Sequence, residues 1–110
     1  MKITDVFFLL LATTQLIAQQ QRKIEETLPT RQVHLDFHTS EQIPNIGAQF
    51  DKKQFQSALL EGNINQINIF SKGHHGYSYY PTKVGTMHPH LDFDLLGAQL
   101  EACPEIGVKA

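Results

Sequence analysis

The sequence predicts an α/β fold in which two parallel strands alternate with two helices. Residues 31–38 alternate between apolar and polar, and 64–70 form a β-branched run, whereas the segments that follow each show helical apolar spacing. Equivalent strand positions lie about 34 residues apart, a repeat that suits a (β/α)8 (TIM) barrel of about 250 residues. We therefore interpret 31–110 as the first two βα units of an incomplete TIM barrel. A Rossmann sheet is less consistent, because no G-x-G-x-x-G follows the first strand.

Length, charge and cysteine content exclude several classes of protein. The chain has 110 residues, of which 41% are hydrophobic and 18% charged, so it fits one small domain or a piece of a larger one. Nine basic residues against 11 acidic ones give a net charge of −2, which argues against a nucleic-acid partner. The single cysteine, Cys103, excludes an internal disulfide and a multi-cysteine zinc site, and we expect it to be buried or unpaired.

The N-terminus predicts a signal peptide over residues 1–18. A basic Lys2 precedes an apolar run over 6–12, and Ala18 offers a small residue for cleavage. The alternative is an amphipathic first helix of the folded domain. The run is shorter than the roughly 20 residues of a spanning anchor, so we expect no stable membrane anchor. We expect the mature protein to be exported, periplasmic or extracellular, with a polar leader over 19–30.

The first strand and helix are predicted from their residue patterns. In the strand over 31–38, the apolar side chains Val33, Leu35 and Phe37 point one way, and His34, Asp36 and His38 point the other. A loop over 39–47 follows. Asp51 can then cap a helix whose apolar stripe is Phe55, Leu59 and Leu60 and which ends at Gly62-Asn63.

The second unit repeats this order. A strand over 64–70 leads into a long loop over 71–89 that is rich in Gly, Tyr, Pro and His. Asp92 or Asp94 caps a second helix. Its apolar side consists of Leu95, Leu96, Leu100 and Cys103. Pro104 and Gly107 end it, and residues 108–110 form the approach to a third strand.

The first group of candidate functional residues lies on the polar face of the first strand. His34, Asp36 and His38 would lie at the carboxyl end of a barrel strand, where such barrels keep their sites. Two imidazoles and a carboxylate can hydrogen-bond sugar hydroxyls, transfer protons, or hold a metal through His34 and His38. The structural alternative is a hydrogen bond between His34 and Asp36 inside the barrel.

The loop after the second strand carries a second cluster. His74 and His75 are followed by Tyr77 and Tyr79, and glycines 73 and 76 permit unusual backbone turns. Hydrogen-bonding groups beside flat apolar rings suit a pyranose, so we predict these four side chains as carbohydrate ligands. A hydrogen-bonded surface loop is the alternative, and Lys72 lies at the site edge or in a salt bridge.

A third cluster, His88-Pro89-His90, contains two more histidines. Without a fixed third partner it is a weak metal signal, and we interpret it as a loop near the rim of the site. Asp92 or Asp94, which follow it, are interpreted mainly as the helix cap.

Three segments resemble a family of bacterial exported (β/α)8 proteins that are classed as glycoside hydrolases and are similar to α-L-fucosidases. They are VHLDFHTS over 33–40, FSKGHHGYSYYPT over 70–82 and LLGAQLEAC over 95–103. In α-L-fucosidases the second barrel strand typically ends in Lys-His-His-Asp-Gly-Phe, whose histidines touch the sugar. His74, His75, Gly76 and Tyr77 match most of this pattern, but Gly73 is inserted and the Asp is absent. The resemblance therefore implies a sugar pocket without implying fucose.

The resemblance also implies what this chain lacks. The two catalytic carboxylates of such enzymes come from later strands, beyond Ala110, so no catalytic residue is assigned here and we expect the chain to be inactive alone. No cofactor is implied. The alternatives are a metal-dependent hydrolase of amidohydrolase or phosphoesterase type, and a non-catalytic carbohydrate-binding module. Because two βα units leave sheet edges unpaired, we expect the isolated chain to self-associate.

Overall fold

The computed structural model describes residues 29–110, and it has the predicted α/β character. Strand β1 (Gln32–Leu35) pairs with β2 (Gln66–Ile69) in parallel, with Val33 opposite Ile67. Helix α2 (Lys52–Glu61) connects them, and helix α3 (Leu95–Ala102) follows β2 before a short 3-10 helix η1 (Pro104–Ile106). The predicted signal peptide and most of the polar leader lie outside the described residues.

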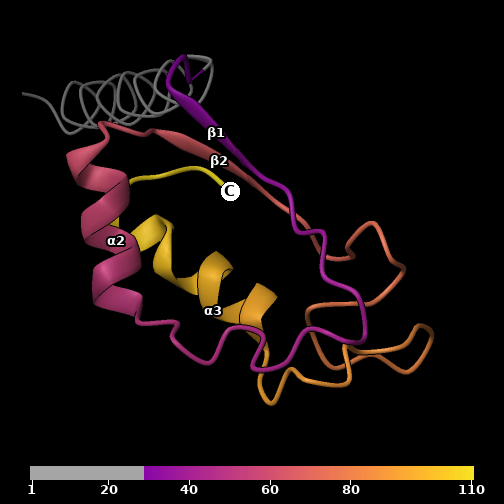
Figure 1. Cartoon of the computed structure of the whole chain (residues 1–110). Helices are drawn as coiled ribbons and strands as arrows, with labels where there is room; N and C mark the ends of the chain where they lie inside the picture. The colour runs from indigo at the N-terminus through magenta and orange to yellow at the C-terminus, as the bar shows by residue number, and fades with distance from the viewer. Residues whose placement is uncertain (1–28) are drawn as a thin grey trace, which may run out of the picture.

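Both helices lie on the same side of the strand pair (Figure 1). The core between them contains Leu59 of α2, Ile67 of β2 and Cys103 at the end of α3. A second apolar cluster of Tyr79, Leu91 and Leu95 continues the core beyond the ends of the strands. Because side chains alternate along a strand, one face of the sheet packs on the helices and the other is free to carry polar groups.

The predicted helix caps form. The side chain of Asp51 accepts a hydrogen bond from the backbone N–H of Gln54 over 2.7 Å, and α2 ends at Gly62. Of the two candidates for the second cap, Asp94 is the one used, since its side chain accepts from the N–H of Gly97 over 2.7 Å. Each cap satisfies an N–H that has no partner within its helix.

Two leucines do not lie where their apolar character predicts. Leu60 and Leu100 are 54% and 45% exposed, respectively. The helices are covered by the sheet on one side only, and Leu60 lies one residue, about 100° of helical rotation, past buried Leu59. On α3 the polar Gln99 is buried in place of Leu100, because it follows Leu95 by one helical turn.

The first strand is shorter than the predicted 31–38. Its ladder ends where Leu35 faces Ile69, the last residue of β2, and after Ile69 the second chain turns away into the loop that contains Gly73. Residues 36–38 nevertheless keep the alternation, with Phe37 half-buried and Asp36 and His38 exposed. The polar face therefore extends beyond the hydrogen-bonded strand.

The C-terminal segment lies alongside β2, on the side opposite β1 (Figure 1). The N–H of Ile67 donates to the carbonyl of Lys109 over 2.8 Å, and the N–H of Lys109 donates to the carbonyl of Asn65 over 3.0 Å. This is a parallel bridge, so the predicted approach of a third strand is confirmed. Within 29–110 neither helix has the length and apolar character needed to cross a membrane.

Candidate functional site

Four polar side chains from the ends of the two strands form one connected group, here called the histidine cluster: Asp36, His38, His74 and His75. The Nε2 atom of His38 lies 2.6 Å from a carboxylate oxygen of Asp36. The ring of His38 stacks on that of His74 with centroids 4.8 Å apart and planes within 4° of parallel. His75 meets His74 edge-on, with centroids 5.4 Å apart. The structure thus brings these four side chains together, and their role as ligands stays a prediction.

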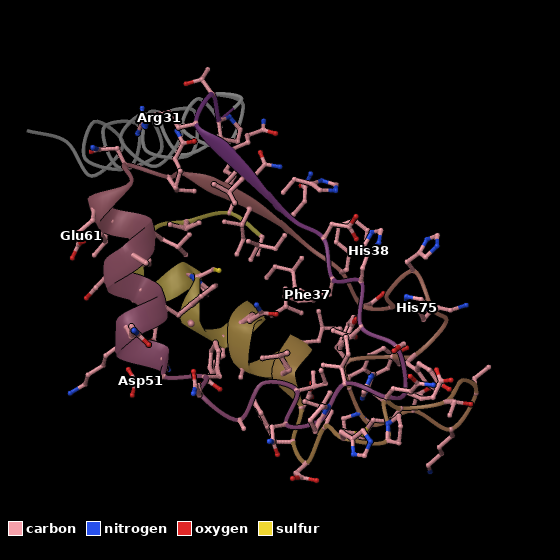
Figure 2. All side chains as sticks on the ribbon, in the orientation of Figure 1. Arg31, Phe37, His38, Asp51, Glu61 and His75 are labelled. Atoms are coloured by element: carbon pink, nitrogen blue, oxygen red, sulfur yellow. The ribbon has the colours of Figure 1, made fainter. Side chains whose placement is uncertain are left out.

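The histidine cluster faces away from the helices. Figure 2 shows Phe37 pointing from its strand toward the helical layer, while His38 and His75 point outward. The side chains of His38 and Asp36 are 57% and 41% exposed. Their donors and acceptors are therefore accessible to a ligand that approaches this face.

His34 lies on the same strand face but makes a different contact. Its ring packs edge-on against Phe70, with centroids 4.9 Å apart. The proposed hydrogen bond between His34 and Asp36 is not the one formed, because Asp36 pairs with His38 instead. Phe70 thus adds a flat apolar ring to this face. Its position two residues after Asn68, which faces His34 across the ladder, is the signal that could have placed it there.

The loop that carries His74 and His75 is held by its own backbone. The N–H of Gly73 donates to the carbonyl of Tyr77, and the N–H of Gly76 donates to that of Gly73, each over 3.0 Å. Lys72 and Ser78 form an antiparallel bridge at the base of the loop. Gly76 has φ of +93°, a conformation that other residues rarely adopt. The two histidines are therefore presented on a closed turn.

Gly73, the residue inserted relative to the fucosidase pattern, lies where no side chain fits. It is buried, and a Cβ atom there would lie 2.9 Å from the carbonyl oxygen of Phe37 and would also meet the hydroxyl of Tyr79. Its backbone thus packs directly on the chain that follows β1. This close approach brings His74 against His38.

The two predicted tyrosine ligands lie in different surroundings from the histidines. Tyr79 is 1% exposed, and its hydroxyl lies 2.6 Å from the hydroxyl of Thr39 and donates to the carbonyl of Phe37 over 3.3 Å. Its polar atom is therefore used inside the fold, because the ring belongs to the second core cluster. Tyr77 is half-buried, with its ring edge-on to His88 at a centroid distance of 5.2 Å.

The third pair of histidines divides into a buried and an exposed member. His88 is 1% exposed; its Nε2 donates to the carbonyl of Ser40 over 2.9 Å, and its Nδ1 accepts from the N–H of His90 over 3.2 Å. Both ring nitrogens thus have partners, which defines the Nε2–H tautomer because a carbonyl only accepts. His90 is exposed. The interpretation as a loop at the site rim thus misses the structural role of His88, whose burial no sequence pattern indicates.

The described part of the chain assembles no group of three or more His, Cys, Asp or Glu side chains able to hold a metal ion. His34 and His38, the alternative metal ligands, contact Phe70 and Asp36 respectively. What the histidine cluster provides is a set of hydrogen-bonding groups beside aromatic faces. Asp36 is its one carboxylate, whereas hydrolysis of a glycoside ordinarily uses two.

Comparison with known proteins gives one clear match. The chain matches no protein-family model and no curated protein. Among solved structures it is similar to part of a glycoside hydrolase. That protein is α-L-fucosidase isoenzyme 2 from Paenibacillus thiaminolyticus, with 58% sequence identity and a TM-score of 0.73 over 74% of this chain. The match spans 12% of the fucosidase chain, so this chain corresponds to a small part of that protein.

Proposed function

We propose that this chain is the N-terminal portion of an exported, α-L-fucosidase-like glycoside hydrolase barrel, in which the histidine cluster contributes to the sugar subsite. The observation that carries the proposal is the cluster itself. Asp36 and His38 follow the carboxyl end of β1, and His74 and His75 follow that of the parallel strand β2. Carboxyl ends of parallel strands are where (β/α)8 barrels place their sites.

The chemistry of this face suits a sugar. A pyranose presents hydroxyls around its rim and C–H groups on its faces. Exposed imidazoles and the carboxylate of Asp36 supply donors and acceptors, and the ring of Phe70 beside His34 supplies an apolar surface. The 58% identity to part of an α-L-fucosidase supports a carbohydrate ligand over other polar ones.

The number of carboxylates in the histidine cluster supports the proposal that the chain alone does not hydrolyse glycosides. Retaining glycosidases need two carboxyl groups about 5–5.5 Å apart, and inverting ones need them about 6.5–9.5 Å apart. The histidine cluster contains one, Asp36, and that carboxylate is already paired with His38. The nucleophile and the acid/base would be supplied by the remaining strands of the complete barrel.

The test is a sugar titration of the 110-residue chain, followed through its histidine side-chain NMR signals. We expect L-fucose at tens of millimolar to shift His38, His74 and His75 and to leave His90, which is exposed outside the cluster, unchanged. The variant His74→Ala should lose the response, and His90→Ala should retain it. No shift at the cluster with any monosaccharide would contradict the proposal.

Two further measurements separate the alternatives. An aryl α-L-fucoside assay should give no turnover with the purified chain, and robust turnover would exclude the role of an inactive portion. A sharp, monomeric unfolding transition together with micromolar glycan binding would instead favour a self-sufficient carbohydrate-binding module. Stoichiometric zinc, manganese or iron retained through dialysis would favour the metal-dependent hydrolase.

Export is tested separately. Expression of the full chain in a bacterium should yield a mature product that begins at Gln19, after cleavage behind Ala18. N-terminal sequencing of the exported protein measures this directly. A cytoplasmic product that retains residues 1–18 would contradict it.

A further inference from the structure

Tyr79 lies inside the fold, next to the two segments that carry the histidine cluster. Its side chain is 1% exposed, and its ring packs with Leu91 and Leu95 in the second apolar cluster. Its backbone is fixed on both sides, because its N–H donates to the carbonyl of Ser71 and its carbonyl accepts from the N–H of Leu96, each over 3.0 Å. A hydroxyl held in this way can act on the histidine cluster only through the chain that it contacts.

The hydroxyl of Tyr79 contacts the chain on both sides of His38. It lies 2.6 Å from the hydroxyl of Thr39, and it donates to the carbonyl of Phe37 over 3.3 Å. A tyrosine hydroxyl has a single proton and a carbonyl only accepts, so the hydroxyl of Thr39 donates to the tyrosine oxygen. The result is a chain of two hydrogen bonds, from Thr39 through Tyr79 to Phe37, that spans the backbone of His38.

The same hydroxyl lies against the second segment of the histidine cluster. Gly73, which precedes His74, is buried, and a Cβ atom there would meet the hydroxyl of Tyr79 and the carbonyl of Phe37. One buried oxygen atom thus contacts the residues on both sides of His38 and the residue before His74. The stack of these two imidazoles, with centroids 4.8 Å apart, forms where the two segments meet.

We propose that Tyr79 is the positioning residue of the histidine cluster, because its hydroxyl holds the backbone of His38 against Gly73 at the distance that stacks His38 on His74. The ring of Tyr79 contributes to the core, edge-on to Phe37 with centroids 5.2 Å apart, whereas its hydroxyl fixes the arrangement of an exposed site that it does not enter. Prearranged groups bind a ligand more tightly, because less conformational freedom is lost on binding. For a sugar to sense this arrangement, the cluster must be the sugar subsite proposed above, on which this inference rests.

The test compares Tyr79→Phe with the wild-type 110-residue chain by NMR. This variant keeps the ring and removes the hydroxyl. The wild-type chain without ligand should show a nuclear Overhauser signal between the ring protons of His38 and His74, which report on the stack. We expect the variant to lose about half or more of this signal and to bind L-fucose about three- to tenfold more weakly, since the hydrogen bonds that hold the arrangement are absent.

Four control variants separate positioning from packing. Thr39→Val removes the hydroxyl that donates to Tyr79 and should weaken the imidazole signal, whereas Thr39→Ser keeps a hydroxyl and should retain it. Tyr80→Phe removes a hydroxyl at the adjacent half-buried position, outside this chain of hydrogen bonds, and should behave as wild type. Leu91→Ala removes packing from the same apolar cluster, so it should unfold at lower urea concentration and leave the imidazole signal unchanged.

An unchanged imidazole signal or an unchanged L-fucose affinity in folded Tyr79→Phe would overturn the inference, as would an equal loss of the signal in Leu91→Ala. Slow modification of Cys103, which belongs to the other core cluster, shows that a variant is folded. If Tyr79→Phe does not fold, the two variants at Thr39 decide. Absence of any L-fucose response in the wild-type chain would contradict the proposed function alone, because the imidazole signal is measured without sugar.

Discussion

The imidazole of His88 donates a hydrogen bond to the backbone carbonyl of Ser40 across 48 residues of sequence. It thereby joins the loop after β1 to the loop after β2, and its other nitrogen holds the backbone of His90. We expect His88→Leu to lower the free energy of unfolding by about 2–4 kcal/mol, because the carbonyl of Ser40 and the N–H of His90 each lose the partner that the buried imidazole provides. Urea unfolding measures this. His90→Leu, at an exposed position, is the matched control and should change stability by less than about 0.5 kcal/mol.

Gly73 supports a second prediction, because its backbone packs against Phe37 and Tyr79. We expect Gly73→Ala to destabilise the chain by about 2–3 kcal/mol, since the new methyl group requires displacement of backbone. Gly107→Ala is the control. A Cβ there meets nothing within 4 Å, and only the positive φ of 71° opposes it. Its expected cost is about 1 kcal/mol. A Gly73→Ala variant as stable as wild type would show that the close approach of the two loops does not form.

The ion pairs between the helices predict a pH dependence of stability. Lys52 lies 2.5 Å from a carboxylate oxygen of Glu105 and 3.0 Å from one of Glu101. The hydrogen bond from Lys52, aided by one from Gln56, holds the pKa of Glu105 below its ordinary value. A carboxyl group whose pKa is lowered by folding stabilises the fold above its unfolded pKa, and that contribution is lost as the pH falls through its folded pKa.

We therefore expect Lys52→Met to unfold at lower urea concentration than wild type at pH 7, with the difference shrinking as the pH falls below 4.5. Salt should also reduce the difference, because the pair is solvent-exposed. Lys53→Met, on the exposed side of α2, is the control and should follow wild type at every pH. A Lys52→Met difference that persists unchanged at pH 3 would assign its cause to packing.

Cys103 reports on the core. Its side chain is fully buried, and burial raises the pKa of its thiol above the ordinary value. Because the thiolate is the reactive form, we expect a disulfide reagent to modify Cys103 slowly in the folded chain and rapidly in urea. The core variant Leu59→Ala, with an expected cost of about 2–4 kcal/mol, should accelerate the reaction. Equal rates for folded and urea-unfolded protein would contradict the described core.

The residue pattern predicts the elements of this fold better than their ends. The alternation over 33–38 and the cap at Asp51 follow from local chemistry. Asp94 is one of two candidates that the same chemistry offers for the second cap, and the parallel pairing follows from the alternation of strands with helices. The end of β1 does not, because it is set by where β2 turns away. The exposure of Leu60 and Leu100 likewise depends on how many sides of each helix are covered, which hydrophobicity does not encode.

In the candidate site, too, some features could be predicted from the sequence and others could not. Parallel topology places the residues that follow β1 and β2 at the same edge of the sheet, so the proximity of His38 and His74 is the part that topology explains. Their role as ligands stays a prediction. The inward position of Tyr79 and the burial of His88 could not be predicted, because their partners are backbone carbonyls of the distant residues Phe37 and Ser40. Every residue has a backbone carbonyl, so the sequence does not show which residue will accept such a hydrogen bond.

The alternation at Phe37, His38 and Thr39 also has a consequence for how this segment tolerates insertion and deletion. Phe37 packs against the second apolar cluster and Thr39 contacts the hydroxyl of buried Tyr79, whereas His38 belongs to the histidine cluster. Loss or gain of one residue between 33 and 38 would exchange the two sets, sending imidazoles into an apolar space and a phenyl ring into solvent. A two-residue change would preserve the faces and shift them along the strand. Variation in length here should therefore occur in steps of two.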